Sequence, residues 1–118
     1  MPDLAPEVTR QRLLIEGYYA GDVDEQRVDE YLHGIAGHLG LRTYGRPAIF
    51  APAGEGRGEN QGFDAFLPLI DSGISLYIWT GPRFVAVVLF TCKVFDEQVA
   101  TDYTCDFFKL TTFEAHAF

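Results

Sequence analysis

Three consecutive segments rich in β-branched and aromatic residues constrain the fold of this chain more than any other feature. They cover residues 62–70, 72–80 and 83–92, and each has the length and composition of a β-strand. Gly81 and Pro82 stand together between the last two segments, and adjacent Gly and Pro residues mark a turn. We therefore expect residues 72–80 and 83–92 to form an antiparallel hairpin.

The position of the turn predicts the register of this hairpin. A turn centred between Gly81 and Pro82 makes paired positions sum to about 163, so Ser72 lies opposite Thr91 and diagonal to Cys92. Cross-strand neighbours have Cβ atoms about 5 Å apart, so the Ser72 hydroxyl and the Cys92 thiol can share one site. The alternative interpretation is ordinary packing, because thiols are often buried and a serine at a strand end often satisfies the backbone.

The segment before these strands predicts one strand and one helix. Residues 12–19 read as a strand. Asp22 and Glu25 have the spacing of an N-cap and its reciprocal partner. Apolar residues then recur at helical intervals up to Gly40, namely Val28, Leu32, Ile35 and Leu39.

Residues 41–61 combine an interrupted strand with a glycine-rich stretch. Gly45 and Pro47 interrupt a predicted strand over residues 41–50, which suits the edge of a sheet. Residues 51–61 read as a flexible loop. A phosphate-binding interpretation of residues 54–58 is disfavoured, because they carry two acids and lack a following Gly-Lys-Ser/Thr.

The C-terminal part completes the predicted fold. Asp96 is expected to cap a second helix, and residues 112–117 alternate as a last strand. The helix carries apolar residues at helical spacing, namely Val99, Tyr103, Phe107 and Leu110. This order predicts an α+β two-layer sandwich in which an antiparallel sheet carries two helices on one face. A length of 118 residues predicts a single domain over residues 1–118.

Charge and hydropathy exclude several classes of partner. Nine basic and 17 acidic residues give a net charge of −8, which disfavours nucleic acid and anionic membranes. The longest apolar run, residues 84–90, is too short to span a membrane. The N-terminal residues lack the pattern of a secretory signal, so a cytoplasmic location is expected.

Cysteine and histidine spacing predicts no metal site. Cys92 and Cys105 lack zinc-ligand spacing and are expected to be reduced thiols, with Cys105 packed on the second helix. His33 and His38 are five residues apart rather than four, so they are expected to face solvent or an interface. His116 reaches Ser72 only if the last strand lies beside the Ser72 strand.

Several motifs resemble the small prokaryotic S-adenosylmethionine decarboxylases, which are pyruvoyl enzymes made as a short proenzyme. Residues 71–79, DSGISLYIW, resemble the self-cleavage segment of that family. The sequence LFTC at residues 89–92 places its cysteine 20 residues after the serine, as in the family. Residues 50–54 and 14–19 resemble two upstream family segments, so the resemblance covers the chain from about Arg12 onward.

The resemblance implies a cut between Asp71 and Ser72 that converts Ser72 into a pyruvoyl group. That group acts as an electron sink for decarboxylation, and Cys92 returns a proton to the substrate. Phe50 matches the position that stacks on adenine. Trp79 is a second candidate for substrate binding, although an aromatic residue there is more often part of the core. The family also forms dimers, so a homodimer is expected.

Four positions depart from the family pattern. Tyr77 replaces the processing histidine, and a phenol is a poorer base than an imidazole at neutral pH. Asp64 replaces a helper serine, Asp71 replaces a glutamate before the cut, and Gly81 replaces a glutamate that binds ribose.

Three functions follow from this comparison. The first is a lyase of polyamine or specialised metabolism that binds S-adenosylmethionine or a related amino acid without cleaving itself or using a cofactor. It would displace methylthioadenosine by ring closure, with Tyr77, Asp64 and Cys92 as its polar groups. The second is a self-cleaving pyruvoyl-dependent decarboxylase of S-adenosylmethionine or a basic amino acid. The third is a non-catalytic homologue that regulates an active partner.

Overall fold

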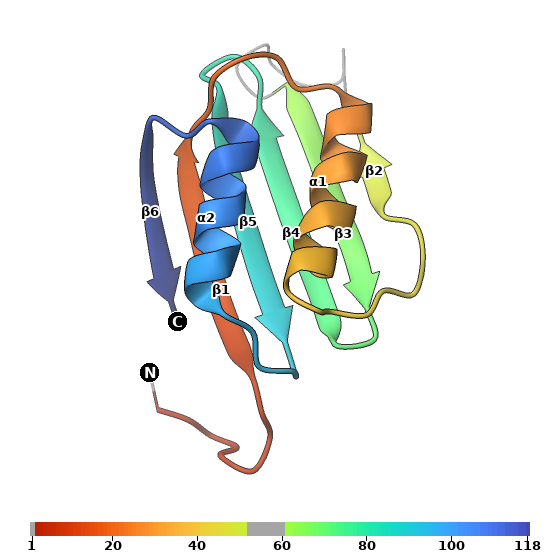
Figure 1. Cartoon of the computed structure of the whole chain (residues 1–118), viewed down its shortest axis with the longest axis vertical. Helices are drawn as coiled ribbons and strands as arrows, with labels where there is room; N and C mark the ends of the chain where they lie inside the picture. Colours follow the sequence, from red (N-terminus) through yellow and green to blue (C-terminus); the bar gives the residue numbers. More distant parts are fainter. Residues whose placement is uncertain (1, 52–60) are drawn as a thin grey trace.

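Within the described residues, six strands form one antiparallel sheet and two helices cover one of its faces (Figure 1). The structure is a computed structural model that describes residues 2–51 and 61–118. The elements are β1 (Gln11–Tyr18), α1 (Glu25–His38), β2 (Ala48–Phe50), β3 (Gly62–Leu69), β4 (Ser72–Trp79), β5 (Phe84–Thr91), α2 (Glu97–Phe108) and β6 (Thr112–Ala117). The sheet order is β2-β3-β4-β5-β1-β6, so β1 lies between β5 and β6. The predicted α+β two-layer class is confirmed.

The central hairpin has the predicted register. Ser72 lies opposite Thr91, and Trp79 lies opposite Phe84 at the turn. Arg83 occupies the left-handed region in that turn, with a φ of 58°. The register follows from the turn position, which sets how residues on the two strands face each other.

The core lies between the helices and the covered face of the sheet. Alternate residues of the four central strands are fully buried on that face, among them Ile15, Leu67, Ile74, Leu76, Val87 and Leu89. From α1, the residues Val28, Tyr31, Leu32 and Ile35 are 0% exposed. These are the apolar positions that recur at helical spacing, so α1 forms because its apolar stripe closes this layer.

The N-cap of α1 differs from the prediction. Asp24, and not Asp22, accepts a hydrogen bond from the Arg27 N–H at 2.8 Å. Both aspartates precede the apolar stripe. Only Asp24 lies three residues before a first-turn N–H, that of Arg27, which has no partner within the helix. Asp22 is exposed and lies 3.4 Å from Arg83.

The predicted strand over residues 41–50 is mostly wrong. Only β2 forms there, and its three residues lie at the edge of the sheet as expected. Gly45 has a φ of 148°, a conformation outside the strand region, and Pro47 follows it. Thr43 makes an isolated bridge to Leu69. Residues 52–60 lie outside the described residues, so the flexible loop over 51–61 stays a prediction.

Helix α2 begins where it was predicted to begin. Its buried residues lie beside the predicted apolar stripe, of which Tyr103, Phe107 and Leu110 are partly buried against the core. Asp96 accepts hydrogen bonds from the N–H groups of Gln98 and Val99. The buried residues are Ala100, Thr101, Thr104 and Phe108, whereas Val99 is 38% exposed. Leu110 lies beyond the helix, because Lys109 adopts a left-handed conformation with a φ of 52°. The rings of Tyr103 and Phe107 instead pack against Tyr31 of α1.

Neither helix in the described ranges is long and apolar enough to cross a membrane. On the exterior of α1, His33 lies 3.4 Å from the Asp29 carboxylate. His38 stacks on Tyr103 with ring centroids 4.4 Å apart.

A buried hydrogen bond joins the two helices and allows a test of the core. The Tyr31 hydroxyl donates to Thr104 Oγ1 at 2.7 Å, because the Thr104 hydroxyl donates to the Ala100 carbonyl. Burial also raises the pKa of Tyr31. Thr104→Val leaves the Tyr31 hydroxyl buried without a partner, which should lower the free energy of unfolding by about 1–3 kcal/mol.

Tyr31→Phe should cost only about 1 kcal/mol, because Thr104 keeps its bond to Ala100. Urea unfolding of both variants and of the double variant measures these differences. Equal losses for the two single variants, or a double variant less stable than Thr104→Val, would contradict this assignment.

Candidate functional site

The turn between β3 and β4 holds the predicted cleavage position in an unusual backbone conformation. Ser72 has a φ of 118°, which residues other than glycine rarely adopt. The Asp71 carbonyl, which belongs to the peptide bond between Asp71 and Ser72, accepts a hydrogen bond from the Cys92 N–H at 2.9 Å. The register therefore brings Asp71, Ser72 and Cys92 together at one end of the sheet, as predicted.

Arg42 holds the Asp71 side chain in place. Asp71 is 2% exposed, and its carboxylate accepts the Arg42 backbone N–H at 2.9 Å and Nη2 at 2.6 Å. Hydrogen bonds from the Arg42 side chain and backbone lower the pKa of Asp71 to about 2. The same pairing raises the pKa of Arg42. At neutral pH, Asp71 is a carboxylate and has no proton to donate.

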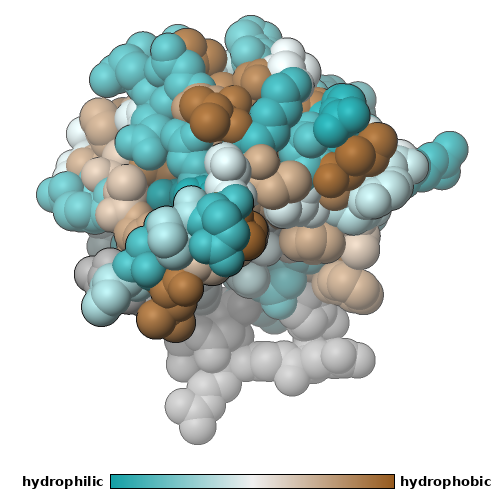
Figure 2. Space-filling model, turned by 90° about the horizontal axis from the view of Figure 1, so that it is seen from below, coloured by the Kyte–Doolittle hydropathy of each residue, from teal (hydrophilic) through white to brown (hydrophobic). Residues whose placement is uncertain are grey.

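The Cys92 thiol is open to solvent at this end of the sheet. Cys92 is exposed directly after β5, and the neighbouring Lys93 ammonium donates to the Gly40 carbonyl at 2.7 Å. Figure 2, which views this end of the molecule, shows a hydrophilic surface broken by small hydrophobic patches. Cys105 is half-buried on α2, and burial raises the pKa of its thiol. Of the two thiols, Cys92 is therefore the accessible one.

A second group of predicted residues lies on the uncovered face of the sheet. Phe50 pairs with Asp64 across β2 and β3, and Asp64 pairs with Tyr77 across β3 and β4. Together with Phe66 and Ser75, these side chains line a hollow of about 260 Å³. Phe50 is 65% exposed and Phe66 is 44% exposed, so both rings are open to solvent.

The two groups do not meet within one chain. Ser72 shares the strand alternation of Ile74 and Leu76, which face the helices, whereas Tyr77 has the opposite alternation and faces outward. Five residues of strand separate Ser72 from Tyr77, a span of about 17 Å. Tyr77 and Asp64 therefore lie beside each other, but neither lies beside Ser72.

Two further predicted residues lie outside both groups. Trp79 packs against Phe84 in a tilted arrangement with ring centroids 5.7 Å apart, and it does not line the hollow. His116 belongs to β6, and β5 and β1 separate β6 from β4. The last strand is thus not a neighbour of the Ser72 strand.

Sequence reasoning missed Arg42, Phe66 and Ser75 as site residues. Phe66 and Ser75 share the alternation of Asp64 and Tyr77, so period-2 spacing was a usable signal for them. Arg42 lies 29 residues before Asp71, and no local spacing connects the two.

The ion pair at the turn predicts a pH-dependent stability. Arg42→Ala should raise the pKa of Asp71 from about 2 toward its ordinary value. Because the pKa in the folded state is the lower one, the pair stabilises the fold above about pH 4 and loses this effect as the pH falls toward 2. The free energies of unfolding of the two proteins should differ most near neutral pH and converge in acid.

Urea unfolding at several pH values and an NMR titration of the Asp71 carboxyl group check this prediction. Arg46→Ala, four residues further along the chain, is the matched control and should leave the titration unchanged. A wild-type Asp71 that titrates near pH 4 would contradict the assignment.

Comparison with known proteins identifies the fold. No family model matches the chain, and no curated protein matches it. Among solved structures, the chain is similar to the adenosylmethionine decarboxylase from Aquifex aeolicus, with a TM-score of 0.69 and 18% identity. The match covers 94% of this chain and 89% of that chain. The chain therefore has an adenosylmethionine decarboxylase-like fold.

Proposed function

We propose that the chain binds S-adenosylmethionine or a related amino acid and acts on it as a lyase without cutting its own backbone. The observation that carries this proposal is the hollow on the uncovered face, where the Asp64 carboxylate lies between aromatic side chains. A carboxylate beside exposed rings suits a ligand that combines a fixed positive charge with an aromatic base.

The residues of the hollow supply binding and orientation. The Phe50 ring is 65% exposed and offers a stacking surface for adenine. The Asp64 carboxylate pairs with the sulfonium or ammonium group, and the hydroxyls of Tyr77 and Ser75 hold the ligand's polar groups.

A sulfonium is a good leaving group, so the reaction needs no electron sink. In the ring closure we propose, an oxygen of the ligand's own carboxylate attacks its γ-carbon. The carbon–sulfur bond breaks, and its electron pair goes to sulfur. The products are neutral methylthioadenosine and a five-membered lactone that keeps the ammonium group. Holding the chain of the ligand in a folded conformation supplies the rate enhancement.

The separation of the two groups supports an uncut chain. Tyr77 and Asp64 occupy the positions of the family's processing residues, but they face the uncovered side of the sheet, whereas Ser72 has the alternation of the covered side. Asp71 is ionised, but Arg42 holds its carboxylate and its pKa of about 2 makes it a weak base. The residues beside Ser72 thus fit the formation of a pyruvoyl group poorly, because the elimination requires a stronger base than this carboxylate.

A specific observation keeps self-cleavage as the second candidate. The rare φ of Ser72 and the Cys92 N–H on the Asp71 carbonyl are features that strain and polarise a peptide bond. A pyruvoyl group from Ser72 would supply an electron sink for loss of carbon dioxide. A water would have to act as the base during maturation, because Asp64 does not lie beside Ser72 in the same chain.

We also propose that a second copy covers the uncovered face. Tyr18, Phe50, Phe66, Tyr77 and Phe90 are all 38–65% exposed on the five strands β1 to β5. Several exposed aromatic side chains on one face of a sheet mark an interaction surface. A homodimer through this face would close the hollow and exclude water from it.

Intact mass and product analysis test the proposed function. The purified chain should keep its full-length mass on long incubation, and S-adenosylmethionine should yield methylthioadenosine without carbon dioxide. Asp64→Asn should weaken binding about 10- to 100-fold, because one charge-assisted contact is lost. Glu16→Gln, a carboxylate on the same face outside the hollow, is the matched control and should bind normally.

The other outcomes point to the alternatives. Two fragments, residues 1–71 and 72–118, together with release of carbon dioxide would establish the second candidate. An uncut chain that shows no binding in calorimetry would contradict both enzymes and leave the non-catalytic homologue.

A further inference from the structure

The strand β6 forms an edge of the sheet that nothing in the described part of the chain protects. It pairs with β1 in an unbroken register from Leu13–Ala117 to Tyr18–Thr112. On its other side it has no neighbour among the described strands. Residues 112–117 contain no proline and no lysine, which commonly block edge pairing. The opposite edge strand, β2, has only three residues.

The free hydrogen-bonding groups of β6 belong to its odd-numbered residues. The Phe118 N–H donates to the Arg12 carbonyl at 3.3 Å. In an antiparallel ladder, the backbone groups of successive residues point alternately toward the paired strand and away from it. Since the Phe118 N–H points toward β1, the N–H and C=O groups of Phe113, Ala115 and Ala117 point away from it. Six backbone groups are thus aligned along this edge and available to another strand.

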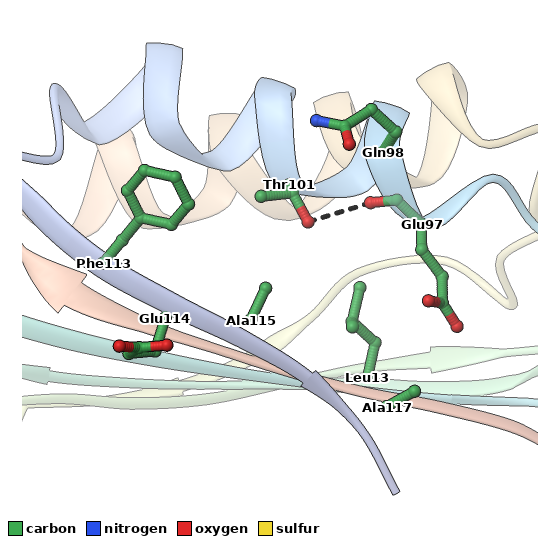
Figure 3. A pocket seen from close by; sticks show the side chains of 8 residues that line it. All are labelled: Leu13, Glu97, Gln98, Thr101, Phe113, Glu114, Ala115 and Ala117. Carbon is green, nitrogen blue, oxygen red and sulfur yellow. Dashed lines mark hydrogen bonds between the residues drawn. The ribbon is translucent and has the colours of Figure 1, made fainter.

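The same three residues leave a hollow between β6 and α2. It has a volume of about 400 Å³, and in Figure 3 the side chains of Phe113 and Ala115 extend toward α2. Positions 115 and 117 are alanines, so β6 does not fill the space below Gln98 and Thr101. Phe113 is 47% exposed at one end of the hollow.

We propose that β6 pairs with β6 of a second copy, antiparallel, about a two-fold axis at Ala115. In this register Ala115 faces the partner's Ala115, and Phe113 faces the partner's Ala117. On the other face of the sheet, Glu114 lies opposite the partner's His116. The Phe113–Ala117 and Glu114–His116 pairings each occur twice, so the edge is complementary to itself in size and in hydrogen-bonding groups.

Neighbouring registers lack this complementarity. A shift of two residues in one direction places Glu114 opposite the partner's Glu114, and like charges directly opposite each other are destabilising. A shift of two residues in the other direction places His116 opposite the partner's His116 and moves Phe113 past the end of the partner strand. A shift of one residue turns each side chain to the wrong face of the sheet.

The hollow favours a second copy over an unrelated peptide. The partner's Phe113 arrives beside Ala117, at the end of the hollow that Leu13 and Glu97 line. A large ring then fills the space that two alanines leave open. This interface requires no ligand and none of the aromatic residues on the uncovered face, so it goes beyond the proposed function. Together, the two interfaces would assemble four chains.

Hydrogen exchange and mass measurements on the full chain test the proposal. The amides of Phe113, Ala115 and Ala117 should exchange at least about 10-fold more slowly at high protein concentration than at low concentration. Ala115→Pro should abolish this effect and halve the mass in sedimentation. The Ala115 N–H points outward, so the proline removes no bond to β1, and circular dichroism should show a folded chain. Ala115→Val keeps the N–H and should pair like the wild type.

A charge exchange tests the register. His116→Glu should weaken self-association about 2- to 30-fold, because it places two carboxylates directly opposite each other at two positions. The double variant Glu114→Lys/His116→Glu should restore self-association, because each carboxylate then lies opposite an ammonium group. Outward amides that exchange at one rate at all concentrations, or an Ala115→Pro mass equal to that of the wild type, would overturn the proposal.

Protection of these amides only when another protein is added would also overturn the proposal, by assigning the edge to that protein. The outcome is independent of the proposed function. Asp64→Asn should leave the protection of β6 unchanged, and Ala115→Pro should still bind S-adenosylmethionine.

Discussion

The pairing of β4 with β5 is the interaction on which the rest of the structure depends. These strands lie at the centre of the sheet, and their eight-residue register places Ile74 and Leu76 in the core below the helices. A slip of one residue would expose Ile74 and Leu76 to solvent. The free energy of burying these side chains therefore fixes the register. The same register brings the Cys92 N–H to the Asp71 carbonyl. Packing of the core and placement of the candidate cleavage position therefore have one cause.

Features encoded over short distances could be predicted from the sequence. The turn at Gly81 and Pro82 predicted the hairpin and its register, and the Asp96 cap was also predicted correctly, because in each case neighbouring residues determine the geometry. The N-cap of α1 was assigned to the wrong aspartate because Asp22 and Asp24 both precede the apolar stripe. The strand predicted over residues 41–50 was too long. Gly45 adopts a conformation outside the strand region, although the residues around it include apolar ones that favour a strand.

The candidate site was predicted in parts. The nearness of Ser72 and Cys92 follows from the turn, but the ion pair between Arg42 and Asp71 joins residues that only the folded sheet brings together. Strand alternation already placed Ser72 and Tyr77 on opposite faces. The family resemblance nevertheless assigned Ser72 and Tyr77 to one site. A sequence motif does not show on which face of the sheet each side chain lies, or whether a second copy completes the site.

The strand order has a consequence for a chain broken at the β3–β4 turn. The two pieces would interleave, because β1 from the first piece lies between β5 and β6 from the second, and β3 of the first pairs along its whole length with β4. Neither piece could leave without dismantling most of the sheet. The covalent bond at this turn is thus dispensable for the architecture, so one fold can accommodate both an intact and a divided polypeptide.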